Sequence, residues 1–237
     1  MHYRELNSQV RRAVETGETD FILDNVIGQR YIGCGLKGDL KFTVNGIPGN
    51  DLAGFMDGPR IDVHGNAQDG VGNTMNAGKV VVHGSAGDVL GHTMRGGSIY
   101  VRDDAGYRVG IHMKEFREHR PVLIIGGRAF DYLGEYMAGG LLIVLGLGGN
   151  GDKPIAGDYV GTGMHGGEII LGEGVEDYQL GREVGVSEVT DEDREKINPH
   201  LIDYCNEFDL DADTIINHSF VKLSPVSARP YGRIYVY

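Results

Sequence analysis

The sequence contains no tryptophan and only two cysteines, Cys34 and Cys205, among its 237 residues. Two cysteines are too few for a disulfide framework or for a cysteine-based zinc site. Long hydrophobic runs are also missing: the longest fully apolar stretch is Leu141–Leu145, far short of the roughly 20 residues that span a bilayer. The N-terminus lacks the apolar run of a signal peptide. We therefore expect a soluble, cytoplasmic protein with no membrane role.

Basic residues are scarce, with 22 Lys and Arg against 34 Asp and Glu and a net charge of −12. A chain this acidic repels phosphate backbones, so binding to nucleic acid through counterion release is not expected. The excess is concentrated between Glu188 and Asp213, where ten acidic residues accompany only Arg194 and Lys196. Because a charge run is usually a solvated face, we interpret these acids as solvent-exposed rather than as paired catalytic carboxylates.

Glycine, in contrast, is abundant, with 39 residues, and it marks an internal repeat. The pattern Gly-x-x-Met-x-x-Gly-x-(Ile/Val)-x-Val recurs after 19 residues, from Gly72–Val82 to Gly91–Val101. Two insertions, of five residues within Lys114–Arg120 and of eight near Gly148–Ile155, leave the register intact. The equivalent positions form a strand series (Phe42, Ile61, Val80, Ile99, Leu123, Leu142, Ile169), a methionine series (Met56, Met75, Met94, Met113, Met137, Met164) and an alanine series (Ala67, Ala86, Ala105, Ala129).

A 19-residue unit is too short for repeats of paired helices, and its period-2 apolar strand with corner glycines favours β-structure. The sequence predicts an all-β fold, a single-stranded right-handed parallel β-helix of about seven 19-residue coils. Equivalent residues would then stack about 4.8 Å apart, with the methionines and alanines pointing inward.

Helical caps are expected at both ends of the rod. Tyr3–Glu15 has amphipathic helical spacing. Near the other end, Thr190 and Asp193 resemble a capping box, and Pro199 is expected to divide the segment that follows into two helices. We predict one domain over residues 1–237: an N-terminal helix and lead-in (1–30), the coils (31–175), and an acidic helical cap with a C-terminal tail (176–237). The final stretch, Ser219–Tyr237, is expected to lie back along the body.

The coils resemble the GXGXG repeat of the C-terminal domain of the glutamate synthase large subunit, and also the β-helical subunit of formylmethanofuran dehydrogenase, which shares that fold. Two features favour the first family. Val26–Gly33 resembles its lead-in, and Asp193–His200 with Ser219–Pro225 resembles its closing helix and its Phe-Val-Lys-x-x-Pro tail. The resemblance implies a non-catalytic structural subunit of a glutamate synthase-type complex, which makes glutamate from glutamine and 2-oxoglutarate.

The same resemblance implies what the partners are. The β-helix would hold glutaminase-type and FMN-dependent synthase subunits in register. FMN and an iron–sulfur cluster would sit on those partner chains, with no cofactor bound here, and self-association stays open. One alternative is a counterpart of the β-helical subunit in formylmethanofuran dehydrogenase or in a related amidotransferase complex. Another is an independent β-helix enzyme, a lyase or an esterase, for which the strand-face residues Lys79 and Arg102 give little support.

Three local patterns invite a chemical interpretation. Gly146–Gly151 matches G-x-G-x-x-G, but no helix is expected to start there to receive a pyrophosphate. His83–Gly87 comes close to a nucleophile elbow, yet Ser85 occupies a turn position of the repeat. His64 and His83 are equivalent and would stack about 5 Å apart, although Arg102 follows in the next coil and would repel a cation.

We accordingly predict no catalytic, cofactor-binding or metal-ligating residue in this chain. His92, His112 and His165 near the Gly-x-x-Met corners are interpreted as solvated or turn-capping. The two insertions are different, because loops on a rigid scaffold are where function tends to concentrate. The Lys114–Arg120 bulge and the Gly146–Asp158 loop are the expected partner contacts.

Overall fold

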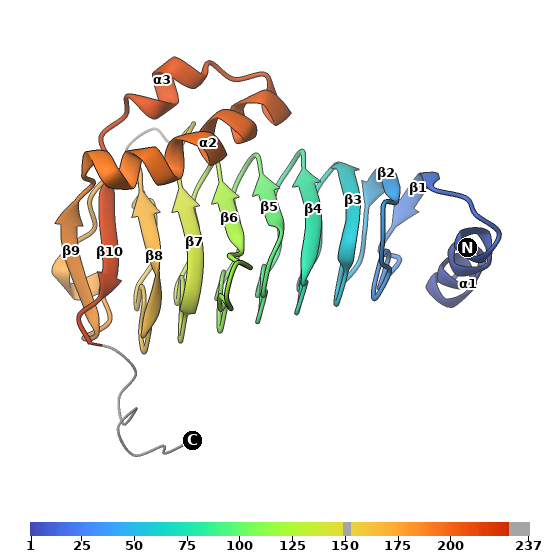
Figure 1. Cartoon of the computed structure of the whole chain (residues 1–237), viewed down its shortest axis with the longest axis horizontal. Coiled ribbons are helices and arrows are strands. Elements are labelled where there is room, and N and C mark those ends of the chain that lie inside the picture. Colours follow the sequence, from blue (N-terminus) through green and yellow to red (C-terminus); the bar gives the residue numbers. More distant parts are fainter. Residues whose placement is uncertain (149–152, 228–237) are drawn as a thin grey trace, which may run out of the picture.

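The computed structural model describes residues 1–148 and 153–227, and it forms one rod (Figure 1). Ten strands make a single sheet in the order β1-β2-β3-β4-β5-β6-β7-β8-β10-β9. The strands are β1 (Asp20–Ile27), β2 (Lys41–Ile47), β3 (Asp57–His64), β4 (Ala77–Val82), β5 (Ser98–Val101), β6 (Val122–Ile125), β7 (Ala138–Val144), β8 (Gly166–Leu171), β9 (Val184–Glu188) and β10 (Val221–Pro225). The helices are α1 (Tyr3–Glu15), the 3-10 helix η1 (Asp177–Gln179), α2 (Asp191–Phe208) and α3 (Ala212–Ile216).

The fold is a parallel β-helix, as the repeat predicts. Strands β1 to β8 pair in parallel, each with the next along the chain. The seven anchors of the strand series fall opposite one another without a slip, and the pairs across the two insertions, Ile99 with Leu123 and Leu142 with Ile169, stay in register. The insertions therefore lie in the corners and leave the sheet unchanged.

The interior of the rod is filled by the two other series. All six methionines are buried, and the alanines Ala67, Ala86 and Ala105 are joined by parallel bridges on a second face of the coil. Together with the strand anchors they form one continuous hydrophobic core from α1 to the last coil. The inward orientation of both series is confirmed.

Glycines of the repeat permit close approach of one coil to the next, and Gly78 of β4 is an example. Gly78 adopts a φ of +103°, and a Cβ placed there would lie 2.2 Å from the carbonyl oxygen of Pro59 in the preceding coil. Such a distance is far inside van der Waals contact, so only glycine fits without a shift of the backbone.

The sheet begins one strand earlier than the repeat indicates. Phe21 of β1 pairs with Phe42 of β2, and the two rings stack with centroids 4.7 Å apart. The spacing here is 21 residues, and a bulge between Leu23 and Val26 interrupts the ladder. Helix α1 forms as predicted and packs against the end of the core through Leu6 and Val14.

At the other end the strand direction reverses. β10 runs antiparallel to both β8 and β9, so the segment around Lys222 lies back along the body as expected; residues 228–237 are outside the described residues. The prediction that Pro199 divides the acidic helix is wrong, because α2 continues through it. A mid-helix proline removes one hydrogen bond at a cost of about 3 kcal/mol, and the buried face of α2 offsets it. None of the helices in the described part of the chain has the length and apolar character needed to cross a bilayer.

Candidate functional site

Helix α2 packs on the outer face of the sheet, and the contact is partly apolar. Its start is fixed by a capping box, in which the Thr190 side chain accepts from the Asp193 N–H and Asp193 accepts from the Thr190 N–H. The buried side of the helix carries Ile197, Leu201 and Tyr204, which pack on outward-facing residues of β5 to β8 in a second hydrophobic cluster. Figure 1 shows α2 crossing the strands near their carboxyl ends.

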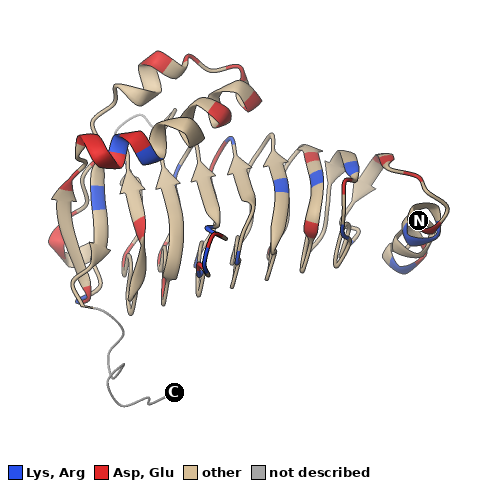
Figure 2. Cartoon of the chain, viewed as in Figure 1, with Lys and Arg blue, Asp and Glu red and all other residues tan. Residues whose placement is uncertain are grey.

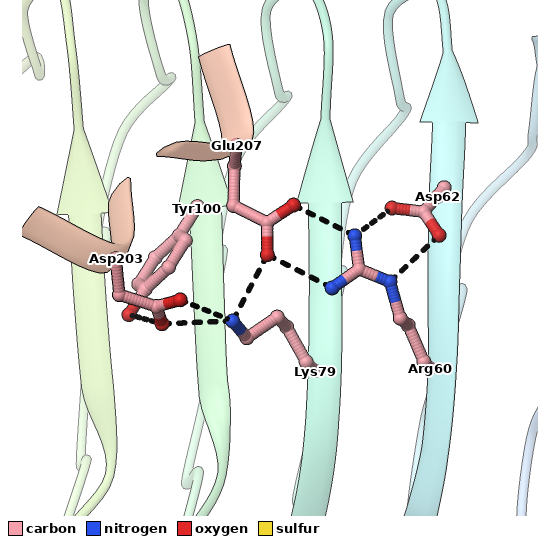
Figure 3. Close-up of polar contacts among 6 residues, drawn as sticks. All are labelled: Arg60, Asp62, Lys79, Tyr100, Asp203 and Glu207. Atoms are coloured by element: carbon pink, nitrogen blue, oxygen red, sulfur yellow. Dashed lines mark hydrogen bonds and ion pairs between the residues drawn. The ribbon is translucent and has the colours of Figure 1, made fainter. Parts of the chain in front are cut away.

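Beyond the apolar contact, α2 is joined to the sheet by a group of charged side chains (Figure 3). Arg60 on β3 donates to Asp62 on the same strand and, through both terminal nitrogens, to Glu207 on α2 at 2.8 and 2.7 Å. Lys79 on β4 donates to both carboxylate oxygens of Asp203 at 2.7 and 2.9 Å and to Glu207 at 3.0 Å. The two carboxylates of α2 thus lie between two basic residues of the sheet.

Tyr100 on β5 completes this group. Its hydroxyl donates to Asp203 at 2.8 Å, and its ring lies 5.1 Å from the Lys79 ammonium. We call the set the helix–sheet clamp, and its members are Arg60, Asp62, Lys79, Tyr100, Asp203 and Glu207.

Three groups of the clamp have pKa values that are shifted away from neutrality. The hydrogen bond from Arg60, with a second from Lys79, lowers the pKa of Glu207 to about 2. The hydrogen bond to Glu207, followed by that to Asp62, raises the pKa of Arg60 above its usual range. Burial, together with the hydrogen bond to Asp203, raises the pKa of the Tyr100 hydroxyl. None of these shifts brings a group towards neutrality, where general acid–base catalysis needs it.

The basic side chains of the clamp already use their hydrogen-bond donors within the clamp. The Lys79 ammonium has three donors and makes three contacts, and the Arg60 guanidinium engages Nε and both terminal nitrogens. Arg60 and Asp203 keep part of their side chains exposed, but their hydrogen bonds run between α2 and the sheet. The arrangement therefore fits a positioning role, which sets where α2 lies and which part of the sheet it covers.

Replacing Glu207 with glutamine should loosen this contact. Because the folded pKa of Glu207 lies below its ordinary value of 4.5, its contribution is present above pH 4.5 and lost as pH falls towards about 2. We expect Glu207→Gln to lower the free energy of unfolding at pH 7 by about 2 kcal/mol, because two charge-assisted contacts weaken. Urea titrations at pH 7 and pH 3 measure the effect, and the difference between variant and wild type should shrink at pH 3.

The matched control is Glu192→Gln on the same helix, where an exposed side chain pairs with Lys196 one turn away. This variant should leave the unfolding midpoint nearly unchanged. If Glu207→Gln behaves like Glu192→Gln at pH 7, the clamp does not hold α2.

The histidine pair stacks as expected. The rings of His64 and His83 lie 4.8 Å apart, and Phe208 of α2 meets His83 edge-on. Burial, then the neighbouring His64, lowers the pKa of His83, so this ring is neutral at pH 7. Across residues 1–148 and 153–227, no group of three or more His, Cys, Asp or Glu side chains is placed to hold a metal ion.

The structure also shows where Ser85 and the described part of the Gly146–Asp158 loop lie. The Ser85 N–H donates to the Asn66 side chain of the preceding coil, so Ser85 lies in a repeat turn and not in a strand–elbow–helix unit. Gly149–Gly151 and Asp152 lie outside the described residues. No helix is found from Lys153 to the start of β8, so the described part of the Gly146–Asp158 loop offers no helix N-terminus for a phosphate.

The Lys114–Arg120 bulge projects from the coil as a tight turn. Phe116 and His119 exchange backbone hydrogen bonds at 3.0 and 3.1 Å, and Phe116 is 66% exposed. A shallow hollow of about 390 Å³ lies beside the turn, lined by Asp57, Asn76, Arg95, Phe116 and His119. At the base of the bulge, Arg120 pairs with Glu168 two coils away.

Aromatic side chains also accumulate on the Gly-x-x-Met corners of the later coils. Tyr132 and Tyr159 stack with centroids 4.9 Å apart, Arg108 lies over the Tyr132 ring, and His112 stacks on Tyr136. His92 lies 6.2 Å from His112 with the two rings tilted at 55°, so two of the corner histidines lie in one row with Tyr136.

The acidic segment differs in part from its interpretation as a solvated face. Asp203 and Glu207 belong to the clamp, and Asp193 is buried, with both oxygens 2.7 Å from the Lys222 ammonium of β10. Figure 2 shows acidic residues along α2, along α3 and in the segment that joins them. The signal that could have identified Asp203 and Glu207 is helical spacing, because the two residues are one turn apart and Asp203 precedes the buried Tyr204.

Comparisons with known proteins agree with this architecture. A protein of Methanocaldococcus jannaschii, named uncharacterized protein MJ1350, is 51% identical over 243 aligned positions, which cover 99% of this chain and 93% of that protein. A chain in the crystal structure of the formyltransferase/hydrolase complex FhcABCD from Methylorubrum extorquens, in complex with methylofuran, has the same fold. The TM-score is 0.66 at 18% identity, covering 90% of this chain and 76% of that chain. The GXGXG motif family matches residues 6–226, nearly the whole length, and the chain belongs to this family.

Proposed function

We propose that this chain is a non-catalytic structural subunit of a multi-subunit enzyme complex, in which the rod holds partner subunits at a fixed spacing. The observation that carries the proposal is the fold match along 90% of the chain to a component of such a complex. The packing supports it, because a continuous hydrophobic core and a single sheet that joins every coil to the next make a rod that resists bending.

The polar groups support the same proposal. The largest cluster of charges around α2, the helix–sheet clamp, uses its hydrogen bonds to hold that helix in place. By this proposal the chemistry and its cofactors belong to partner chains, and this chain supplies geometry and docking surface.

The fold match favours one type of complex. The component it resembles belongs to a formyltransferase/hydrolase complex that binds methylofuran. We infer that this chain acts as the counterpart of the β-helical subunit in a formylmethanofuran dehydrogenase-type complex or in a related amidotransferase complex. Its partners would then carry the formyl-transfer or hydrolysis chemistry.

A glutamate synthase-type complex is the second candidate, and the ends of the chain favour it. The lead-in Val26–Gly33 and the tail Ser219–Pro225 resemble those of the glutamate synthase domain. In the structure the tail joins the sheet as β10, where Lys222 binds the first turn of α2. In this case the partners would be a glutaminase-type and an FMN-dependent synthase subunit, with FMN and an iron–sulfur cluster, and the product would be glutamate.

Affinity purification from the native lysate distinguishes the two candidates. The full chain carries a tag at its C-terminus, and co-eluting proteins are identified and quantified by mass spectrometry. Stoichiometric recovery of formyltransferase/hydrolase-type subunits supports the first assignment, and recovery of glutaminase-like and flavin-containing chains supports the second. If the chain elutes alone and monodisperse, the structural-subunit proposal is wrong, and an independent enzyme such as a lyase or an esterase becomes the better hypothesis.

A further inference from the structure

Strand β1 is the outermost strand at the N-terminal end of the sheet (Figure 1). In a parallel ladder, alternate residues of a strand direct their N–H and C=O groups to the same side. The Lys41 N–H donates to Thr19 O, and Asp20 is the register partner of Lys41. Phe21 and Leu23 consequently point their backbone groups at β2. Ile22 points its N–H and C=O away from the sheet, to an edge where no strand of the described residues pairs.

The outward face of β1 has a simple pattern of side chains. Asp20, Ile22 and Asp24 are all exposed, and Ile22 is 71% exposed. The carboxylates thus flank an isolated aliphatic side chain on one face of the edge. Across the rest of the outer face, the contacts of α2 in the described residues extend from β8 to Arg60 on β3.

Two hollows flank this edge. One, of about 290 Å³, lies between α1 and β1 and is lined by Met1, Leu6, Gln29 and the segment 22–26. The other, of about 550 Å³, lies at the carboxyl end of the strand, beside the exposed side chains of Ile27 and Ile47. A strand laid along β1 would direct alternate side chains to the outer face of the sheet and to the inner side, where α1 packs on the core and the first hollow lies.

A second copy of the chain does not suit this edge. An antiparallel pair of β1 strands centred on Ile22 would set Asp20 of each copy opposite Asp24 of the other. Like charges directly opposite destabilise a strand pair. The bulge between Leu23 and Val26 further shortens the length that can pair.

We propose that the free edge of β1 binds an extended segment of a partner subunit in which basic residues flank an aliphatic one on the same face, in the pattern basic-x-aliphatic-x-basic. Backbone hydrogen bonds from Ile22 would hold the segment, and its basic side chains would pair with Asp20 and Asp24. The inference rests on the proposed role as a structural subunit, and it locates one of the contacts that such a subunit makes.

A peptide titration on the purified full chain tests the edge without the complex. The probe is an acetylated, amidated peptide containing Arg-Val-Ile-Val-Arg, which presents the same charges in either strand direction. The control probe replaces both arginines with glutamates. Amide NMR follows binding, and hydrogen exchange is measured at single residues. We expect exchange at the Ile22 amide to slow at least tenfold with the arginine peptide, with no change at Phe21 or Leu23, which already bond β2.

Two variants make the result specific. Ile22→Pro removes the outward N–H without removing any ladder bond and should abolish binding, whereas Ile22→Thr keeps the N–H and should bind. Asp20→Lys combined with Asp24→Lys keeps the backbone and should exchange the preference, so that the glutamate peptide binds at least tenfold more tightly than the arginine peptide.

Three results would overturn the proposal. The first is that both peptides bind equally well. The second is that the Ile22 amide exchanges no more slowly in the presence of millimolar arginine peptide. The third is that light scattering shows a dimer of the wild-type chain, which Ile22→Pro dissociates. The last result would mean that a second copy of the chain binds the free edge of β1. The peptide titration needs no partner subunit, so it can fail while the co-purification succeeds, and it can succeed while the co-purification fails. The binding edge of β1 and the role as a structural subunit are therefore tested separately.

Discussion

The replacement of Gly78 by alanine is expected to lower the free energy of unfolding by about 3–5 kcal/mol, near the upper limit for a single substitution. Gly78 has a φ of +103°, and a Cβ would lie 2.2 Å from Pro59 O and 2.9 Å from Gly58 C. Both obstacles are backbone atoms of the adjacent coil, so no side chain can move to make room. The coils must separate locally, and urea denaturation followed by circular dichroism measures the loss.

Gly35→Ala is the matched control for this substitution. Gly35 also has a positive φ, +67°, but nothing lies within 4 Å of the position that its Cβ would take. We expect a loss of about 1–2 kcal/mol, the cost of the backbone conformation alone. Equal losses in the two variants would mean that close packing between coils does not limit stability.

The second large effect is expected at the centre of the methionine ladder. Met94 is fully buried, with Met75 and Met113 as its counterparts in the adjacent coils. Met94→Ala should cost about 2–5 kcal/mol, because it removes buried surface and leaves a cavity that the neighbouring coils cannot close. A coil contacts only its neighbours, so the loss also weakens the junction between the two halves of the rod.

Met94→Leu is the corresponding control, since it conserves volume and should cost less than about 1.5 kcal/mol. The denaturant midpoints of the two variants, measured side by side, distinguish the destabilisation caused by the cavity from that caused by the loss of the sulfur atom. A Met94→Ala protein as stable as Met94→Leu would show that this part of the core repacks freely.

The fold could be predicted in detail because its signal is periodic. Every coil repeats the same residue types at the same places, so Phe42, Ile61 and Val80 each support the assignment of the others. Strand β1 escaped this reasoning for a physical reason. Its anchor Phe21 is 21 residues from Phe42 rather than 19, and the bulge near Asn25 takes up one of the two additional residues.

The helix–sheet clamp could not be predicted in the same way. Lys79 and Asp203 are 124 positions apart, and no periodic pattern links them. Helical spacing shows which side of α2 is apolar, but it does not show which strands that side meets. The prediction at Pro199 is wrong for a related reason: local propensity favours a break, and the tertiary packing of Ile197 and Leu201 on the sheet outweighs it.

The insertions at Lys114–Arg120 and near Gly148–Ile155 leave the register of the sheet unchanged. The length of the rod is therefore set by the number of coils and not by the number of residues. Its length can change only by the gain or loss of a whole coil, in steps of about 4.8 Å. Its corners, by contrast, can lengthen one residue at a time without moving any rung. The length of the rod and the shape of its corner loops can therefore change independently. Loops on the surface can diverge among relatives while the distance between any two coils stays constant.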